Sequence, residues 1–300
     1  MGNVQTGYMG IANISTLLGS TIDVRCTDFN INAQQNATFY DHVIGLNDTI
    51  SAGPDTKGEV PGTIQTQKKY WRPSPIVIQG GMSFLATYPV LSGSGVGSEM
   101  NFQTLFDYAK YGNYFDLDFK YFCGGGRLFT DCRVNNFSLS VMAADIVNIT
   151  VDIMAKDMVD SDTVVTKTAS QKLVTWDKVE LSLSGDLGGI SDTNNLQGFD
   201  FSINNNIQAI HTASPIAVTN KLLPSDLRIG MQEVTGTLYI YKKQGPDFLS
   251  PLTSDATMDL TIGTFTTPIY AIIEPRQIAG AVGPIILNVP FAGIDKAFGV

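Results

Sequence analysis

The sequence is poor in the residues from which most active sites and metal sites are built. Histidine occurs only at His42 and His211, and neither has a second residue at metal-ligand spacing. A serine or cysteine nucleophile needs a nearby base, usually histidine, and the sequence has no nucleophile elbow. We therefore predict no catalytic, cofactor-binding or metal-binding residues, and we do not expect an enzyme.

Cysteine is also scarce. The chain has three, Cys26, Cys123 and Cys132, so they cannot all pair within it, and a disulfide framework is excluded by number. Cys123 and Cys132 flank a glycine run that is a plausible hairpin turn, and their side chains could meet across it. Spacing alone does not show a bond, and we expect reduced, partly buried thiols.

Charge and long apolar runs are limited as well. Charged residues make up 16% of the chain, and 28 acidic against 19 basic residues give a net charge of −9. Tight binding to nucleic acid phosphates needs clustered Lys and Arg, so this balance argues against it. The N-terminal residues lack the features of a secretory signal, and no window approaches the length of apolar sequence that spans a membrane. We expect a soluble chain, made in the cytoplasm, that does not insert into membranes.

A short strand-like phrase occurs twice in the chain. The residues Asp28, Phe29, Asn30, Ile31 and Asn32 return 172 positions later as Asp200, Phe201, Ser202, Ile203 and Asn204. Each copy is followed by a polar stretch and then by a second strand, at 76–86 and at 234–241. A repeat of this period indicates two copies of one β-rich domain, because solenoid units are much shorter. Duplication without a catalytic constellation favours assembly over chemistry.

Most segments with a clear pattern have a period of two, which is typical of half-buried antiparallel strands. The strongest examples are 115–122, 145–156 and 178–184. Several such strands with turn residues between them predict a sandwich or barrel. The predicted fold is therefore mainly β, with two tandem antiparallel β-sandwich or barrel domains.

One segment has helical spacing instead. Between residues 98 and 111 the apolar positions recur at i, i+3, i+4 and i+7, and they are Phe102, Leu105, Phe106 and Ala109. Ser98 is available as a cap and Gly112 as a stop. We predict a single flanking α-helix in the first domain.

The predicted domains are 1–157 and 172–300, joined by a polar linker at 158–171. The first contains a long, proline-bearing stretch at 34–75 with few alternating runs, which we expect to be a functional loop. The end of this loop concentrates basic and aromatic residues, including Tyr70, Trp71 and Arg72. Such residues often anchor interfaces, and we expect an assembly role for them; a loop folded against its own domain competes almost equally.

Six segments carry a resemblance to a known family. They occur in the order 136–140, 147–156, 179–185, 201–206, 233–238 and 273–276. The most specific part is the asparagine run at 204–206 followed by the strand phrase Glu-Val-Thr-Gly-Thr-Leu at 233–238. In this order the segments resemble the two-domain tail tube proteins of tailed bacteriophages, clearly in the C-terminal half and through the repeat and the helix in the N-terminal half.

The resemblance implies a fold, an assembly and partners. Tail tube proteins are sandwiches or barrels with a flanking helix that join sheets edge to edge into rings, and the rings stack into a hollow tube for DNA ejection. For a duplicated chain this implies rings of three chains with pseudo-sixfold symmetry, or rings of six. It also implies contact with other tail proteins, such as a tape measure protein, a baseplate and in some tails a sheath, with DNA passing non-specifically. The chain would be made in the bacterial host and reside in the virion tail.

Other functions remain open at this point. A minor tail component, such as a baseplate hub or distal tail protein, can use the same fold. A different class is a β-sandwich module that binds a carbohydrate or a cell surface; it would show an aromatic-lined cleft and would stay monomeric.

The polar faces of the long strands are candidates for the channel wall. If the apolar faces pack into each sandwich, the opposite residues are left for solvent, and they are Asn148, Thr150 and Asp152 in the first copy with Thr235 and Thr237 in the second. We expect these side chains to face the lumen, which would then be hydrophilic and neutral to acidic.

Overall fold

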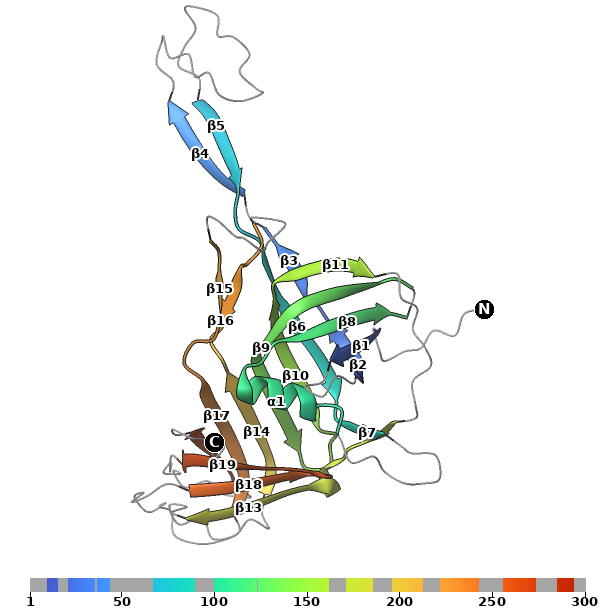
Figure 1. Ribbon diagram of the computed structural model, residues 1–300. Helices are drawn as coiled ribbons and strands as arrows, with labels where there is room; N and C mark the ends of the chain where they lie inside the picture. The colour runs from blue at the N-terminus through green and yellow to red at the C-terminus, as the bar shows by residue number, and fades with distance from the viewer. Residues whose placement is uncertain are drawn as a thin grey trace, which may run out of the picture.

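The computed structural model describes residues 10–15, 21–35, 37–43, 67–89, 100–122, 124–161, 171–185, 196–212, 222–242, 256–273 and 285–293. In these ranges the protein is mainly β, as the sequence predicts, with one α-helix and a three-residue 3-10 helix at Trp176–Lys178 (Figure 1).

The first half forms a closed barrel. Its strands are β1 (Gly10–Ser15), β2 (Thr21–Phe29), β6 (Val77–Leu85), β8 (Phe115–Tyr121), β9 (Gly126–Met142) and β10 (Asn148–Ala155). The ring closes because β10 pairs with both β6 and β9, and all pairings are antiparallel. Short strands extend its margins: β3 (Asn32–Gln34) pairs with β6, β11 (Asp157–Ser161) pairs with β9, and β7 (Thr87–Pro89) pairs with β12 (Gln171–Leu173).

The second half continues the same sheet. Its strands, in spatial order from β9, are β14 (Leu196–Asn204), β17 (Glu233–Lys242), β20 (Ile285–Gly293), β19 (Phe265–Ile273), β18 (Ala256–Ile262) and β13 (Val179–Gly185). The connection is possible because β9 is 17 residues long. The first part of β9 pairs with β8, and the second part uses the same edge to pair with β14.

The repeated phrase lies on equivalent strands. It falls on the end of β2 and the start of β3 in the first half and on β14 in the second, and each of these segments pairs antiparallel with the next long strand of its copy, β6 or β17. Asp28 stands opposite Ser83, and Asp200 stands opposite Thr237. The copies differ in the other neighbour, which is β1 for β2 and β9 for β14.

The helix α1 (Gln103–Tyr111) starts later than the sequence predicts. Phe102 is its N-cap, while Ser98 lies outside the described residues. The start is fixed by a turn in which the Asn101 side chain accepts a hydrogen bond from Thr87 N at 2.8 Å and donates one to Leu85 O at 2.9 Å. The predicted end is confirmed: Gly112 has a φ of 66°, the left-handed conformation that favours glycine.

The helix packs its apolar side against β9 and β14 (Figure 1). The Phe106 ring lies 5.6 Å from that of Phe137 on β9, 6.2 Å from Phe201 on β14 and 5.0 Å from Phe265 on β19. One hydrophobic core therefore contains side chains from both halves. The domain boundary predicted at 158–171 stays a prediction, although its first residues lie in β11 and Gln171 lies in β12.

The stretch 34–75 is more regular than the loop we predicted. After the last residue of β3 it holds β4 (Ala37–Val43) and β5 (Gln67–Pro73), which pair antiparallel and extend away from the body (Figure 1). Phe39 is opposite Trp71 and Tyr40 is opposite Tyr70, and aromatic residues suit paired strands even where polar and apolar residues do not alternate. Residues 44–66 lie outside the described part. We refer to the β4–β5 pair as the arm.

Candidate assembly surfaces

A polar surface crosses both halves of the sheet without interruption. Its central row runs over five adjacent strands, one residue per strand: Ser83, Thr150, Ser138, Ser202 and Thr235, on β6, β10, β9, β14 and β17. Every member carries a hydroxyl group and none is buried. We call this row and its two neighbours the polar face.

The two neighbouring rows are polar with few exceptions. One consists of Leu85, Asn148, Ser140, Asp200 and Thr237, and the other of Gly81, Asp152, Asn136, Asn204 and Glu233. The three rows contain three carboxylates and no Lys or Arg. The polar face is therefore rich in hydroxyl and amide groups with an acidic bias.

Side chains on the polar face hydrogen-bond to one another across strands. Thr150 and Ser83 share a hydroxyl–hydroxyl contact of 3.3 Å, and Ser202 donates to Asn136 Oδ1 at 3.3 Å. Partial burial raises the pKa of Asp152, and a hydrogen bond from Asn136 opposes this effect. Tyr239 donates to Asp200 at 2.7 Å, which raises the pKa of the tyrosine. These contacts hold the polar groups in place along the sheet.

The opposite side of the same strands is apolar. The row one residue along contains Phe84, Ile149, Leu139, Phe201 and Gly236. Gly236 is required here because an added Cβ would come within 2.3 Å of the Phe291 ring. The helix covers this side, so the core fixes which side of the sheet is exposed.

The five residues predicted to line a channel all lie on the polar face. Thr150 and Thr235 belong to its central row, Asn148 and Thr237 share the second row, and Asp152 is in the third. The structure thus brings together residues from two copies 83 or more positions apart. That this face borders a channel stays a prediction.

The other predicted residues, Tyr70, Trp71 and Arg72, lie on β5 in the arm, away from the polar face (Figure 1). Their backbone pairs with Tyr40, Phe39 and Thr38 of β4, while their side chains lie outside the described part. Their assembly role stays a prediction.

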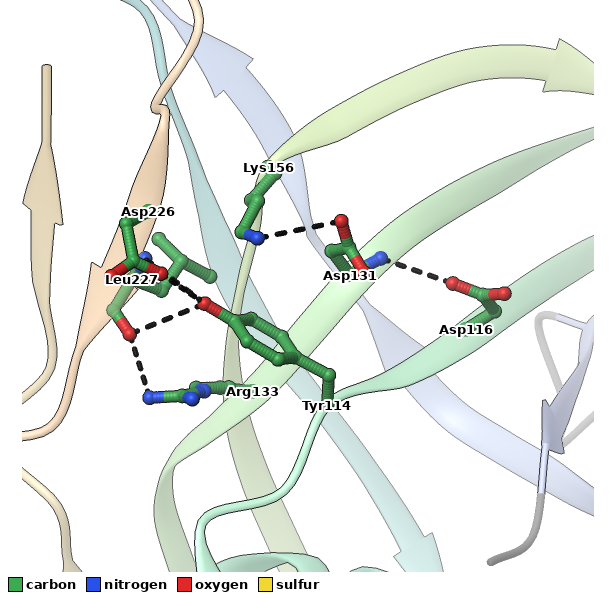
Figure 2. Close-up of polar contacts among 7 residues, drawn as sticks. All are labelled: Tyr114, Asp116, Asp131, Arg133, Lys156, Asp226 and Leu227. Atoms are coloured by element: carbon green, nitrogen blue, oxygen red, sulfur yellow. Dashed lines mark hydrogen bonds and ion pairs between the residues drawn. The ribbon is translucent and has the colours of Figure 1, made fainter. Parts of the chain in front are cut away.

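Sequence reasoning missed a docked hairpin. Strands β15 (Gln208–Ile210) and β16 (Asp226–Arg228) form it, and it occupies the place in the second copy that the arm occupies in the first. Tyr114, just before β8, holds it: its hydroxyl donates to the Asp226 carboxylate and accepts from Leu227 N at 3.2 Å (Figure 2). The hydrogen bond from Tyr114 lowers the pKa of Asp226.

Two cations complete this contact. The Arg133 guanidinium lies 3.9 Å from the centre of the Tyr114 ring and the Lys156 ammonium 4.2 Å, with the ring between them (Figure 2). Arg133 also donates to Leu227 O at 2.7 Å, and Lys156 forms an ion pair with Asp131 at 3.4 Å. The members come from segments far apart in the chain, so no local pattern indicates the cluster.

The asparagine run after β14 closes the junction between the halves. Asn205 is fully buried, and its side-chain amide donates to Ala109 O and Val134 O, both at 2.8 Å. Gln232 donates to Asn205 Oδ1 at 2.9 Å and to Ala109 O at 3.0 Å. Asn205 therefore satisfies a carbonyl at the end of α1 and links it to β9 and to the start of β17.

The fold and these surfaces define a mainly β protein built around one large sheet with an extended polar face and a projecting strand pair. A comparison with protein-family models matches residues 85–293 to the phage tail tube protein family. The chain belongs to this family and is a structural protein of the virion tail. No curated protein matches the chain. No helix among the described residues has the length and apolar character needed to cross a membrane.

Proposed function

We propose that the chain is the major tail tube subunit, which closes into rings that stack around a channel for DNA. The observation that carries this proposal is the continuity of the polar face across the β9–β14 junction. A sheet that already passes from one copy to the next without a break is suited to closing into a cylinder by further edge-to-edge contacts.

The electrostatics of the polar face suit the wall of such a channel. The three rows hold Asp152, Asp200 and Glu233 but no cation. Phosphates passing along the face meet no fixed positive charge, so each contact is weak and DNA can move quickly. Hydroxyl and amide groups keep the wall hydrated.

The two copies set the expected ring composition. Three chains supply six copies and give a pseudo-sixfold ring, and six chains give a wider ring of twelve. Stacked rings would meet a tape measure protein and a baseplate, with a sheath outside in a contractile tail. The subunit would be made in the bacterial cytoplasm before assembly.

Electron microscopy of the purified protein tests this proposal. We expect rings or tubes with a hollow centre at high concentration, and the same subunit as the most abundant tail protein in virions. A chain that remains monomeric by light scattering and forms no ring or tube, in virions included, would contradict it. Presence in only a few copies per virion would indicate a minor tail component instead.

A further inference from the structure

The junction between the two copies gives a template for the contact between chains. Within the chain, the second part of β9 pairs with β14, and Asn136 stands opposite Asn204. If the copies are equivalent, the strand that corresponds to β9 in the second copy is free to meet the strand that corresponds to β14 in the first. The strand pairings identify both.

The first correspondence comes from the repeated phrase. Asp28 matches Asp200, and by the same offset Asn32 matches Asn204. Asp28 is opposite Ser83 on β6, and Asp200 is opposite Thr237 on β17, so β6 matches β17 with Ser83 at the place of Thr237.

The next pairings match β10 with β20. Ser83 is opposite Thr150 on β10, and Thr237 is opposite Pro290 on β20. Two residues along, Asp152 on β10 therefore takes the place of Ala292 on β20.

The last step matches β9 with β19. Asp152 is opposite Asn136 on β9, and Ala292 is opposite Ile272 on β19. Ile272 therefore matches Asn136, the residue that pairs with Asn204 in the internal junction.

Both edges that this match selects lack a second strand in the part of the chain that the structure describes. On β19 the pairing with β18 ends at Ala271, so Ile272 and Ile273 have only β20 beside them. On β2 the pairing with β1 ends at Cys26, and the following residues through β3 pair only with β6. Ile272 is 45% exposed although large and apolar, which fits a residue that is covered by a partner.

We infer that the end of β19 pairs antiparallel with the β2–β3 segment of a second copy of this chain, with Ile272 opposite Asn32. The side chains agree in direction: Ile272 lies in line with the central row of the polar face, through Ala292 and Thr235, and the exposed Asn32 lies on the same side of its sheet. The contact repeats the internal junction and continues the polar face from chain to chain. This inference rests on the proposed ring assembly and specifies its strands and register.

Cysteine cross-linking between two different chains tests the register. One chain carries Ile272→Cys and the other, with a tag that changes its mass, carries Asn32→Cys; Cys123→Ser is present in both. Mixed before assembly and oxidised in the assembled state, they should form a covalent heterodimer, because directly opposite residues lie within disulfide reach. The matched control replaces Asn32→Cys by Ala33→Cys, which is also exposed but points to the other side of the strand, and should give little heterodimer.

The outcomes separate this inference from the proposed function. Tubes that form without the Ile272–Asn32 cross-link, or that cross-link equally well through Ala33→Cys, would overturn the register while leaving the tube role intact. If the variants fail to assemble, hydrogen exchange on the unmodified protein decides: within 27–32 and 272–273, the backbone amides that do not already bond to β6 or β20 should become protected when tubes form, whereas the amide of Asn30, which donates to Gly81 O, should not change. Unchanged exchange in tubes would overturn the inference, and failure of the unmodified protein to form any tube or ring would overturn the proposed function.

Discussion

At the scale of single residues, the polar face owes its character to what is absent from it. The central row has only hydroxyl groups, and the flanking rows add amides and carboxylates but no cation. A fixed positive charge on a channel wall would hold phosphates by an attraction that salt screens, because the Debye length is about 30 Å at 0.01 M and about 10 Å at 0.1 M ionic strength.

The first residue-scale prediction is a charge reversal on this face. Thr150→Lys with Asp152→Lys should leave tube assembly largely intact and slow DNA ejection at low salt by roughly ten-fold or more, with recovery as salt is added. Single-particle ejection assays measure this. The matched control is Thr175→Lys with Asp177→Lys, the same changes at the same spacing at an exposed site off the polar face. Normal ejection by the first variant, or a tube structure that places these side chains on the outer wall, would show that the face is misassigned.

The second residue-scale prediction concerns the buried amide at the junction. Asn205→Leu removes the donors to Ala109 O and Val134 O and the acceptor for Gln232, and we expect it to lower the free energy of unfolding by about 2–4 kcal/mol. Chemical denaturation measures this. The neighbouring Asn206→Gly is the control: its φ of 47° is left-handed, and the one hydrogen bond that its side chain donates, to Met231 O at 2.8 Å, is exposed, so glycine should cost less than about 1 kcal/mol. Equal losses in both variants would contradict a special role for Asn205.

At the scale of elements, the arm and the docked hairpin follow equivalent strands in the two copies: the arm lies between β3 and β6, and the hairpin between β14 and β17. They differ in the contacts that hold them against the rest of the protein. The hairpin is tied to the barrel through Tyr114, Arg133 and Asp226, whereas the described pairing of the arm is between its own strands. A two-stranded pair alone is marginally stable in water, so the arm is suited to gaining partners on assembly.

We predict that the arm becomes protected when tubes form, anchored by Tyr70 and Trp71. Limited proteolysis should cut free subunits within 34–75 and spare this range in tubes. The hairpin region, at Asp226–Arg228, serves as the internal comparison and should resist cleavage in both states. Equal cleavage of the arm in subunits and tubes would show that it plays no part in assembly.

Elements with a strong local signal could be predicted from the sequence. The alternation at 115–122, 145–156 and 178–184 matches β8, β10 and β13, and Gly112 marks the end of α1. Where the outcome depends on a distant partner, local patterns were insufficient. The helix starts late because Asn101 binds the backbone of residues 85 and 87, and β4 and β5 are strands because each supplies the other with hydrogen bonds.

At the scale of the whole molecule, the repeated phrase was visible in the sequence, and the continuous sheet that contains both of its strands was not. The repeated phrase correctly indicated equivalent strands, and the alternation correctly sorted Thr150 and Thr235 onto exposed faces. Nothing in the sequence showed that β14 would pair with β9, because period-two alternation predicts a strand and its buried side but not its neighbour. That pairing turned two polar strand faces into a single surface and two cores into one.

The shared strand β9 places an uneven constraint on how the chain can vary. Loss or gain of one residue in its second part would reverse the side-chain direction of every later position, so that Phe137 and Leu139 would point to solvent and Ser138 into the core. Because β10 and β14 both pair with this strand, the shift would misalign strands of both copies. We therefore expect natural relatives to tolerate changes of length between β4 and β5 and to keep the length of β9 fixed.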